Sequence, residues 1–487
     1  MLRRGLRMWL LSFAASVLAL AAEQQSGTIA EGTPWATAWF AQDSGQPGPT
    51  VLIVGGVHGN EPAGARAAAQ VRHWPIARGK LVVIPRANEL GLREGTRLLP
   101  GGEDRDLNRN FPQEAGEEPR GELAKALWTF VGKVRPAWLL DLHEGIGARQ
   151  QDAKTTGSSI IHDRRAATAA QAARVLEAVN ATVADAGRKF VLLRGAARGA
   201  LARAAAEQLN ALTLILETTW KGQPLSLRTR QHRLMVYRFL TDLEMLAGSP
   251  DVLLPPKRSE GEVRVALYDA GGASSSADAL EGKIAGMAKA RVERVGPPEI
   301  LAGALEQFDV LVIPGGGASR QATAITPEGR EAIRKFVADG GGYVGVCAGA
   351  YLATCGYAWS LAILDARAVD TKHWQRGTGN VKIELTADGC RILGDRTGLI
   401  GIWYANGPLM APASRPDIPD FTVLALFRSE INKNNAPQGV MLGTPAMACG
   451  AWGKGRVFVI SVHPERTAGL DAFVRRAVQW AKQGEPR

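Results

Sequence analysis

The chain has 487 residues, enough for two or three domains, and a globular composition with 46% hydrophobic and 22% charged residues. Its formal net charge of +11 would suit an anionic polymer such as the cell wall or a nucleic acid. The charge is scattered Arg and Lys, however, and there is no zinc finger, aromatic RNA-binding motif or dense basic run. We therefore expect a solvated basic surface and no nucleic-acid partner.

The first 21 residues have the pattern of a secretory signal peptide, which we place at 1–21. Three arginines precede an almost wholly apolar stretch at 8–20, and a small-x-small cleavage site ends it. The apolar stretch is shorter than the roughly 18 residues of a membrane helix, and no later segment reaches that length. We expect a secreted or periplasmic protein with no stable membrane anchor after cleavage. An arginine pair also allows twin-arginine export, although ordinary secretion fits the following residues better.

The next informative stretch is 51–64, VLIVGGVHGNEPAG, where an apolar run ends in a glycine pair. His58 and Glu61 follow at a spacing that lets both bind one metal ion from a single turn. Their imidazole and carboxylate suit Zn²⁺, which takes three protein ligands in catalytic sites and leaves a fourth position for water. His143, after the apolar run 137–142, supplies a third candidate ligand.

Strands and helices alternate through the first half, which implies a mostly parallel sheet covered on both faces. Ligands then gather at the carboxyl ends of the strands, where His58, His143 and Glu217 fall. We expect strands at 81–87, 137–142 and 189–193, and helices at 120–134, 166–186, 199–209 and 226–246.

A third motif, DLNRNFP at 106–112, lies between the two ligand motifs. Together the three resemble the zinc carboxypeptidase superfamily, and within it the branch of succinylglutamate desuccinylase and aspartoacylase. The resemblance covers roughly 50–245. It implies a zinc-dependent hydrolase of amide bonds in which His58, Glu61 and His143 hold the metal.

The resemblance also assigns roles to the residues of the third motif. Asp106 would orient the ring of His58 through a hydrogen bond. Asn108 and Arg109 would bind a substrate carboxylate, which a planar guanidinium can pair through two hydrogen bonds.

Two further residues would take part in catalysis. Glu217 lies in the apolar run 213–219, where a carboxylate is costly unless it is paired or used. By resemblance it is the general base that activates a zinc-bound water. Arg97 would polarise the scissile carbonyl, with Arg93 as the competing position. The larger carboxypeptidases carry a substrate-binding tyrosine before this glutamate, whereas Tyr237 follows it, so specificity of the digestive type is not expected.

The segment 249–262, SPDVLLPPKRSEGE, interrupts the pattern with three prolines and several charges. Prolines prevent a helix from continuing, and the composition suits a short solvated linker. We therefore expect one domain at 27–248 and a second at 263–484, beginning with a strand at 263–268.

The second half centres on GGGYVGVCAGA at 340–350, where a strand runs into Cys347 and then a helix. Such an elbow presents a side chain at a strained turn beside a helix N-terminus, where a thiolate is favoured. Near the C-terminus, the strand 457–461 is followed by His463 and Glu465. These three residues form a candidate catalytic triad.

The order of the triad resembles class I glutamine amidotransferases, and most of all the amidotransferase-like domain named after the N-terminal region of biotin–protein ligase. The resemblance covers roughly 264–481. It implies a flavodoxin-like fold, so we expect two three-layer α/β/α domains, the first a zinc carboxypeptidase-like domain with a mixed sheet. The motifs that carry the resemblance are PGGG at 314–317, VCAGAY at 346–351, NGP at 406–408 and HPE at 463–465.

In that family Cys347 would be the nucleophile, His463 its base and Glu465 the orienting acid. Backbone amides around Gly316 and Ala348 would face the oxyanion. A true amidotransferase hands ammonia to an acceptor domain, and this chain contains no synthetase motif or ATP-binding P-loop. The remaining alternatives are a thiol hydrolase and a binding domain that has kept the elbow.

Two functions are therefore weighed for the whole chain. The first is an exported Zn²⁺ hydrolase for a small peptide or N-acyl amino acid, with cell-wall peptide as the first substrate candidate. The second is a zinc-stabilised binding protein for anionic wall polymers with a non-catalytic second domain. Three more cysteines also lie in the second half, and one pair could form a disulfide that the sequence does not identify: Cys355, Cys390 and Cys449.

Overall fold

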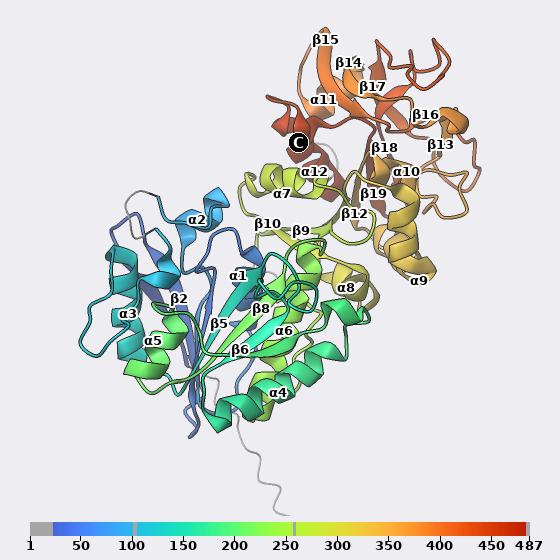
Figure 1. Cartoon of the computed structure of the whole chain (residues 1–487). Helices are drawn as coiled ribbons and strands as arrows, with labels where there is room; N and C mark the ends of the chain where they lie inside the picture. Colours follow the sequence, from blue (N-terminus) through green and yellow to red (C-terminus); the bar gives the residue numbers. More distant parts are fainter. Residues whose placement is uncertain (1–22, 101–104, 257–259, 484–487) are drawn as a thin grey trace, which may run out of the picture.

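The computed structural model describes residues 23–100, 105–256 and 260–483. Two α/β units follow one another along the chain, blue to green and then yellow to red in Figure 1. The signal peptide predicted at 1–21 lies outside the described residues. Among the described helices, none has the length and apolar character needed to span a membrane.

The first unit is built on an eight-stranded mixed sheet with the order β1-β2-β4-β3-β5-β8-β6-β7. Strands β4, β3, β5 and β8 run parallel to one another, and β6 runs parallel to β7. The β1–β2, β2–β4 and β8–β6 pairs are antiparallel. The strands are β1 (Glu23–Ile29), β2 (Thr37–Asp43), β3 (Thr50–Gly55), β4 (Lys80–Ile84), β5 (Trp138–Gly145), β6 (Ser159–His162), β7 (Val191–Arg194) and β8 (Leu212–Thr219).

Helices cover both faces of this sheet, as expected. Alternate residues of β3 point to opposite faces, so Val51 and Ile53 pack with α1, α4 and α6, while Leu52 and Val54 pack with α3 and α5. The helices are α1 (Pro62–Val71), α2 (Glu89–Glu94), α3 (Glu122–Val134), α4 (Ala166–Asn180), α5 (Leu201–Gln208) and α6 (Leu225–Asp242), with the short 3₁₀ turns η1 (Leu107–Arg109) and η2 (Ala186–Arg188).

The predicted alternation of elements is confirmed, with differences at several ends. Strand β5 continues past the predicted end at 142, because its pairing with β8 extends to Gly145 and Thr219. His143 therefore lies within a strand and not after one. Helix α4 ends at Asn180, six residues before its predicted end.

The second unit contains a nine-stranded sheet with the order β10-β9-β11-β12-β19-β18-β17-β14-β15. Its first five strands are parallel, in the flavodoxin-like order, which confirms the predicted fold class. The strands are β9 (Val263–Tyr268), β10 (Ala290–Val295), β11 (Val310–Ile313), β12 (Gly342–Val346), β14 (Thr378–Leu385), β15 (Leu399–Ala405), β17 (Thr422–Phe427), β18 (Pro445–Trp452) and β19 (Gly455–Ile460), with β13 (Ala366–Val369) and β16 (Leu409–Pro412) forming a separate pair.

Helices also cover both faces of the parallel part of this sheet. Helices α7 and α12 share one core cluster, and α8, α9 and α10 share the other. The helices are α7 (Ser276–Ala285), α8 (Pro297–Leu301), α9 (Ala318–Ala338), α10 (Ala348–Ala353), α11 (Ala387–Leu393) and α12 (Asp471–Gln483), with the 3₁₀ turns η3 (Ala304–Gln307), η4 (Thr371–His373) and η5 (Pro464–Arg466).

The two units contact each other through α1 and α6 of the first and β10, α7 and α8 of the second (Figure 1). Gln70 donates a hydrogen bond of 3.0 Å to Glu293, and Arg230 donates one of 2.7 Å to Glu299. These contacts join segments more than 60 residues apart. The segment predicted as a linker, 249–262, follows α6 and precedes β9.

Candidate metal centre and thiol site

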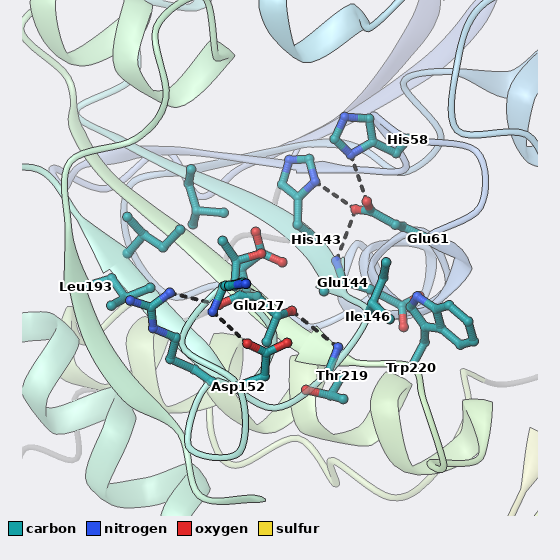
Figure 2. A pocket seen from close by; sticks show the side chains of 18 of the residues that line it. His58, Glu61, His143, Glu144, Ile146, Asp152, Leu193, Glu217, Thr219 and Trp220 are labelled. Atoms are coloured by element: carbon teal, nitrogen blue, oxygen red, sulfur yellow. Dashed lines mark hydrogen bonds and ion pairs between the residues drawn. The ribbon is translucent and has the colours of Figure 1, made fainter.

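His58, Glu61 and His143 form one buried cluster in which each offers a ligand atom, and these atoms lie within 4.8 Å of one another (Figure 2). The fold brings them together because β3 and β5 are adjacent parallel strands. His58 lies in the loop after β3, Glu61 is the N-cap residue directly before α1, and His143 projects from β5. A Cβ added at Gly59 would lie 2.0 Å from the backbone of Gly91, so this loop closes only with a glycine beside His58.

Both imidazole rings turn the same nitrogen toward Glu61. Nδ1 of His58 lies 2.8 Å from Oε1 of Glu61, and Nδ1 of His143 lies 2.8 Å from Oε2. The opposite nitrogens face carboxylates, with Nε2 of His58 3.0 Å from Asp106 and Nε2 of His143 3.0 Å from Asp141. Such carboxylate–imidazole pairs fix the orientation of metal-binding histidines.

The electrostatics of the cluster suit a cation. Burial opposes ionisation of Glu61, but His143 and His58 hold its pKa below the ordinary value. Burial also opposes protonation of His143, but Asp141 and Glu61 raise its pKa well above the ordinary value. Nδ1 of His58 is buried without a hydrogen-bond partner among the described residues, although Glu61 is near. Two nitrogens and a carboxylate are a donor set that fits a metal ion.

Glu217 lies beside this cluster on β8. It is the register partner of His143 on β5, and its side chain lines the same cavity (Figure 2). Burial raises its pKa to about 7, even though His143 lowers it. A carboxyl group with such a pKa can accept and return a proton near neutral pH.

The cluster opens into a cavity of about 1160 Å³ with a strongly basic lining. Ile146 and Trp220, which are 62% and 42% exposed, add apolar surface to it (Figure 2). An excess of positive charge over the four acidic residues of the lining favours an anionic ligand. The basic residues that line it are Arg97, Arg109, Arg149, Lys154, Arg188, Arg194 and Lys221.

Asn108 and Arg109, the expected carboxylate-binding pair, both line this cavity. Nδ2 of Asn108 lies 3.3 Å from Nε2 of His143, and its Oδ1 accepts a hydrogen bond of 2.9 Å from the amide of Leu201. Arg109 donates to the carbonyl of Asn108 at 2.7 Å, which holds its guanidinium at the cavity.

Arg97 also lines the cavity, whereas Arg93 is exposed on α2 and is not part of the lining. Nη1 of Arg97 donates to Glu61 at 2.7 Å. Tyr237 packs into the hydrophobic core of the first unit, with its ring 6.1 Å from that of Trp74. It takes no part in the cavity.

The sequence interpretation missed Asp141 and five of the basic cavity residues. Asp141 carried a signal, since residues two apart on a strand share a face and His143 was already a candidate. Arg149 and Arg188 come from connecting segments, whose course no local pattern indicates.

Cys347 occupies a strained turn between β12 and α10, as the elbow pattern predicts. Its φ is 51° and its ψ is −97°, a conformation that residues with a side chain rarely adopt. Nδ1 of His463 lies 2.7 Å from Oε1 of Glu465, which also accepts a hydrogen bond of 2.8 Å from Ser276. Burial opposes protonation of His463, but its interactions with Cys347 and Glu465 raise its pKa to about 10.

The loop after β11 closes over this site. A Cβ added at Gly315 would lie 2.9 Å from Cε1 of His463, so this loop packs against the imidazole ring. Gly316 is the next residue of the loop. Ala348 follows Cys347 at the start of α10. All four cysteines are free thiols, with Cys347, Cys355 and Cys449 buried and Cys390 partly exposed.

Two family models match the chain. Residues 47–241 match the succinylglutamate desuccinylase/aspartoacylase catalytic domain, a hydrolase domain that acts on amide bonds. Residues 304–367 match the N-terminal domain of biotin–protein ligase. Both matches confirm the resemblances inferred from the motifs. No curated protein sequence matches the chain.

Several solved structures resemble part of the chain. The Gln46His variant of Cell Shape Determinant protein Csd4 from Helicobacter pylori is 20% identical, with a TM-score of 0.37 over 45% of this chain and 63% of that one. An mDAP-bound form of Csd4, described as a D,L-carboxypeptidase, is 22% identical, with a TM-score of 0.36 over 41% and 51%. The ectoine utilization protein EutE from Ruegeria pomeroyi is 19% identical, with a TM-score of 0.34 over 44% and 62%. The matched region thus spans between half and two thirds of each of these chains.

Proposed function

We propose that the chain is an exported, zinc-dependent hydrolase that cleaves an amide bond next to a free carboxylate. The observation that carries this proposal is the His58–Glu61–His143 cluster, with Glu217 beside it, in a basic cavity. The match to the desuccinylase/aspartoacylase catalytic domain supports the same reaction class.

The site residues would divide the work as follows. A zinc ion bound by His58, Glu61 and His143 would polarise the substrate carbonyl and lower the pKa of a water molecule. Asp106 would hold the ring of His58, and Asp141 would hold the ring of His143, each from the Nε2 side. Glu217, which lines the cavity beside the cluster, would accept the proton of the attacking water and return it to the leaving amine.

Substrate binding would use the basic lining of the cavity. The Arg109 guanidinium, with Asn108 beside it, would pair with the free carboxylate in the fork geometry that guanidinium groups provide. Arg97 would reach the scissile carbonyl by exchanging its ion pair with Glu61 for the developing negative charge.

A small peptide with several carboxylates fits this cavity better than a neutral one. Its lining has seven basic residues, more than are needed for one carboxylate. Together with the predicted signal peptide, this makes cell-wall stem peptides our first substrate class, ahead of N-succinyl and N-acetyl amino acids.

The experiment compares wild type with His58→Ala, His143→Ala and Glu217→Gln. Both histidine variants should lose bound zinc, while Glu217→Gln should keep zinc and lose activity by a factor of roughly 100 or more. Mass spectrometry after incubation with muropeptides, N-succinyl and N-acetyl amino acids identifies the bond that is cleaved. Unchanged zinc content in both histidine variants would reject the metal site.

The alternative is a zinc-stabilised binding protein for anionic wall polymers, which the basic cavity also accommodates. In that case wild type cleaves none of the substrates, and Glu217→Gln retains full polymer binding. Cleavage by wild type that Glu217→Gln abolishes excludes this alternative.

A further inference from the structure

Arg376 is a charged side chain buried in the second unit, in the loop before β14. It is only 1% exposed, although arginine is almost never fully buried unless it is paired. Its Nη2 donates a hydrogen bond of 2.5 Å to Oδ2 of Asp370, whose Oδ1 lies 2.6 Å from Nδ1 of His373. Asp370 is thus engaged on both oxygens.

The other terminal nitrogen of Arg376 has no such partner. Nη1 is buried and makes no hydrogen bond with any described residue. A buried, unsatisfied N–H of a charged group is costly, so structures rarely keep one without a use. One half of the guanidinium fork therefore has no acceptor among the described residues.

The backbone places Arg376 next to the thiol site. The amide of Gly377 donates a hydrogen bond of 2.8 Å to Oδ1 of Asn406. The preceding residue, Ala405, accepts a hydrogen bond of 3.3 Å from Sγ of Cys347. The loop that carries Arg376 is therefore bonded to the segment that the thiol contacts.

The Cys347 thiol and the Arg376 guanidinium both influence the pKa of two tyrosines near the thiol. Burial raises the pKa of Tyr351 and of Tyr404, the Cys347 thiol raises both further, and the Arg376 guanidinium lowers both. The guanidinium and the thiol thus act on the same two rings. Ser461 is near as well, since the preceding Ile460 accepts the Cys347 amide at 2.7 Å, and its Oγ is buried without a partner among the described residues.

We propose that Arg376 binds a carboxylate of the molecule that occupies the Cys347 site, so that this second site selects ligands with a free acid group. A planar guanidinium with one side held by Asp370 offers its remaining N–H groups in a fixed direction. A carboxylate oxygen accepts such hydrogen bonds more strongly than a neutral carbonyl does. The inference does not depend on the zinc site, because none of its residues lies in the first unit.

Two thiol reagents that differ only in charge test this selectivity. Iodoacetate and iodoacetamide each react with a thiolate to form a thioether and release iodide, but only iodoacetate carries a carboxylate. The rate of each reaction at Cys347 is measured in the full chain by peptide mass spectrometry. Cys390, which is partly exposed, reports in the same molecule the intrinsic ratio of the two rates.

The ratio of the iodoacetate rate to the iodoacetamide rate should be at least about tenfold higher at Cys347 than at Cys390, the size expected of one charge-assisted pair of hydrogen bonds. Arg376→Gln should reduce this ratio to that of Cys390, while Arg376→Lys should keep part of the preference. Thermal unfolding and the Cys390 rates control for loss of structure. If Arg376→Gln does not fold, protection of wild-type Cys347 from iodoacetamide by succinate but not by succinamide gives the same answer.

Several outcomes would overturn the proposal. Equal ratios at Cys347 and Cys390 in wild type, or an unchanged ratio in folded Arg376→Gln, would mean that the guanidinium has only a structural role. Failure of Cys347 to react with either reagent would mean that the site does not admit a ligand. Protection by phosphate but not by succinate would replace the carboxylate by a phosphate.

Discussion

Asp141 and His143 lie two residues apart on β5 and project from the same face of the strand, with Oδ2 of Asp141 3.0 Å from Nε2 of His143. Asp141 is fully buried, and its oxygens make no hydrogen bond that meets standard geometry with any described residue. The imidazole is thus the principal group that compensates this buried charge. A cation bound at Nδ1 of His143 would make the imidazole ring more positive and so stabilise the buried Asp141 carboxylate further.

We therefore predict that Asp141→Asn lowers the affinity for zinc by roughly 10- to 100-fold, because a neutral amide holds the ring of His143 less firmly and makes it less basic. Zinc retention against a chelator measures this. Asp43→Asn is the matched control, since Asp43 lies on β2 of the same sheet and is 42% exposed. Equal zinc retention in both variants would contradict the prediction.

A second prediction compares two helical glycines. A Cβ at Gly64 on α1 would lie 2.6 Å from the carbonyl oxygen of Leu142, whereas nothing lies within 4 Å of a Cβ at Gly132 on α3. Gly64→Ala should lower the free energy of unfolding by about 1–3 kcal/mol through overpacking and also weaken zinc binding, because Leu142 precedes His143. Gly132→Ala should raise the free energy of unfolding by about 0.5–1 kcal/mol. Urea unfolding and zinc analysis test both, and a Gly64→Ala variant as stable as wild type would be evidence against this packing.

The contact between the two units gives a third prediction. Glu299 is 3% exposed and accepts hydrogen bonds from Arg230 at 2.7 Å and from Arg233 at 3.1 Å. Glu299→Ala should lower the free energy of unfolding by about 3–5 kcal/mol, because it leaves the buried Arg233 charge without its acid. The exposed Glu306→Ala should change it by less than about 0.5 kcal/mol. Similar urea midpoints for the two variants would show that this interface contributes little.

The fourth prediction concerns pH. The pKa of His463 rises from its ordinary value of 6.5 to about 10 in the folded chain, so the folded state keeps a proton that the unfolded state releases. The resulting stabilisation is complete below about pH 6.5 and is lost as the pH rises through about 10. The free energy of unfolding of wild type should therefore fall across this interval, and His463→Gln should have a flatter dependence. Urea unfolding at several pH values measures both slopes, and identical slopes would refute the assignment.

The extent to which the sequence predicts this structure differs between strands and loops. His58 and Glu61 could be placed because a short loop after a buried strand fixes their spacing, and His143 because parallel strand ends converge. Strands β1 and β2 were missed, since EQQSGTI and TAWFAQD have no continuous apolar run. They lie at one edge of the sheet, where half of the strand faces solvent.

The positions of the arginines around the two sites are harder to predict from the sequence than the strands are. Arg149 reaches the cavity from a loop and Arg188 from the 3₁₀ turn η2, and the course of both segments depends on the whole fold. Arg376 is buried although arginine ordinarily lies at the surface, so residue type alone pointed the wrong way. The sequence interpretation therefore named candidate acid–base and metal-binding residues that lie close together in the structure, but it underestimated how much positive charge surrounds both sites.

The pairing of β5 with β8 has a consequence for how such a protein can diversify. His143 and Glu217 are register partners, so their separation is set by the distance of about 4.8 Å between neighbouring strands and not by a loop. Segments around the cavity, such as 146–156 and 188–195, can lengthen, shorten or exchange residues among descendants of this gene while that separation stays constant. Changes in these loops can thus alter what the cavity binds while the spacing of His143 and Glu217 is kept.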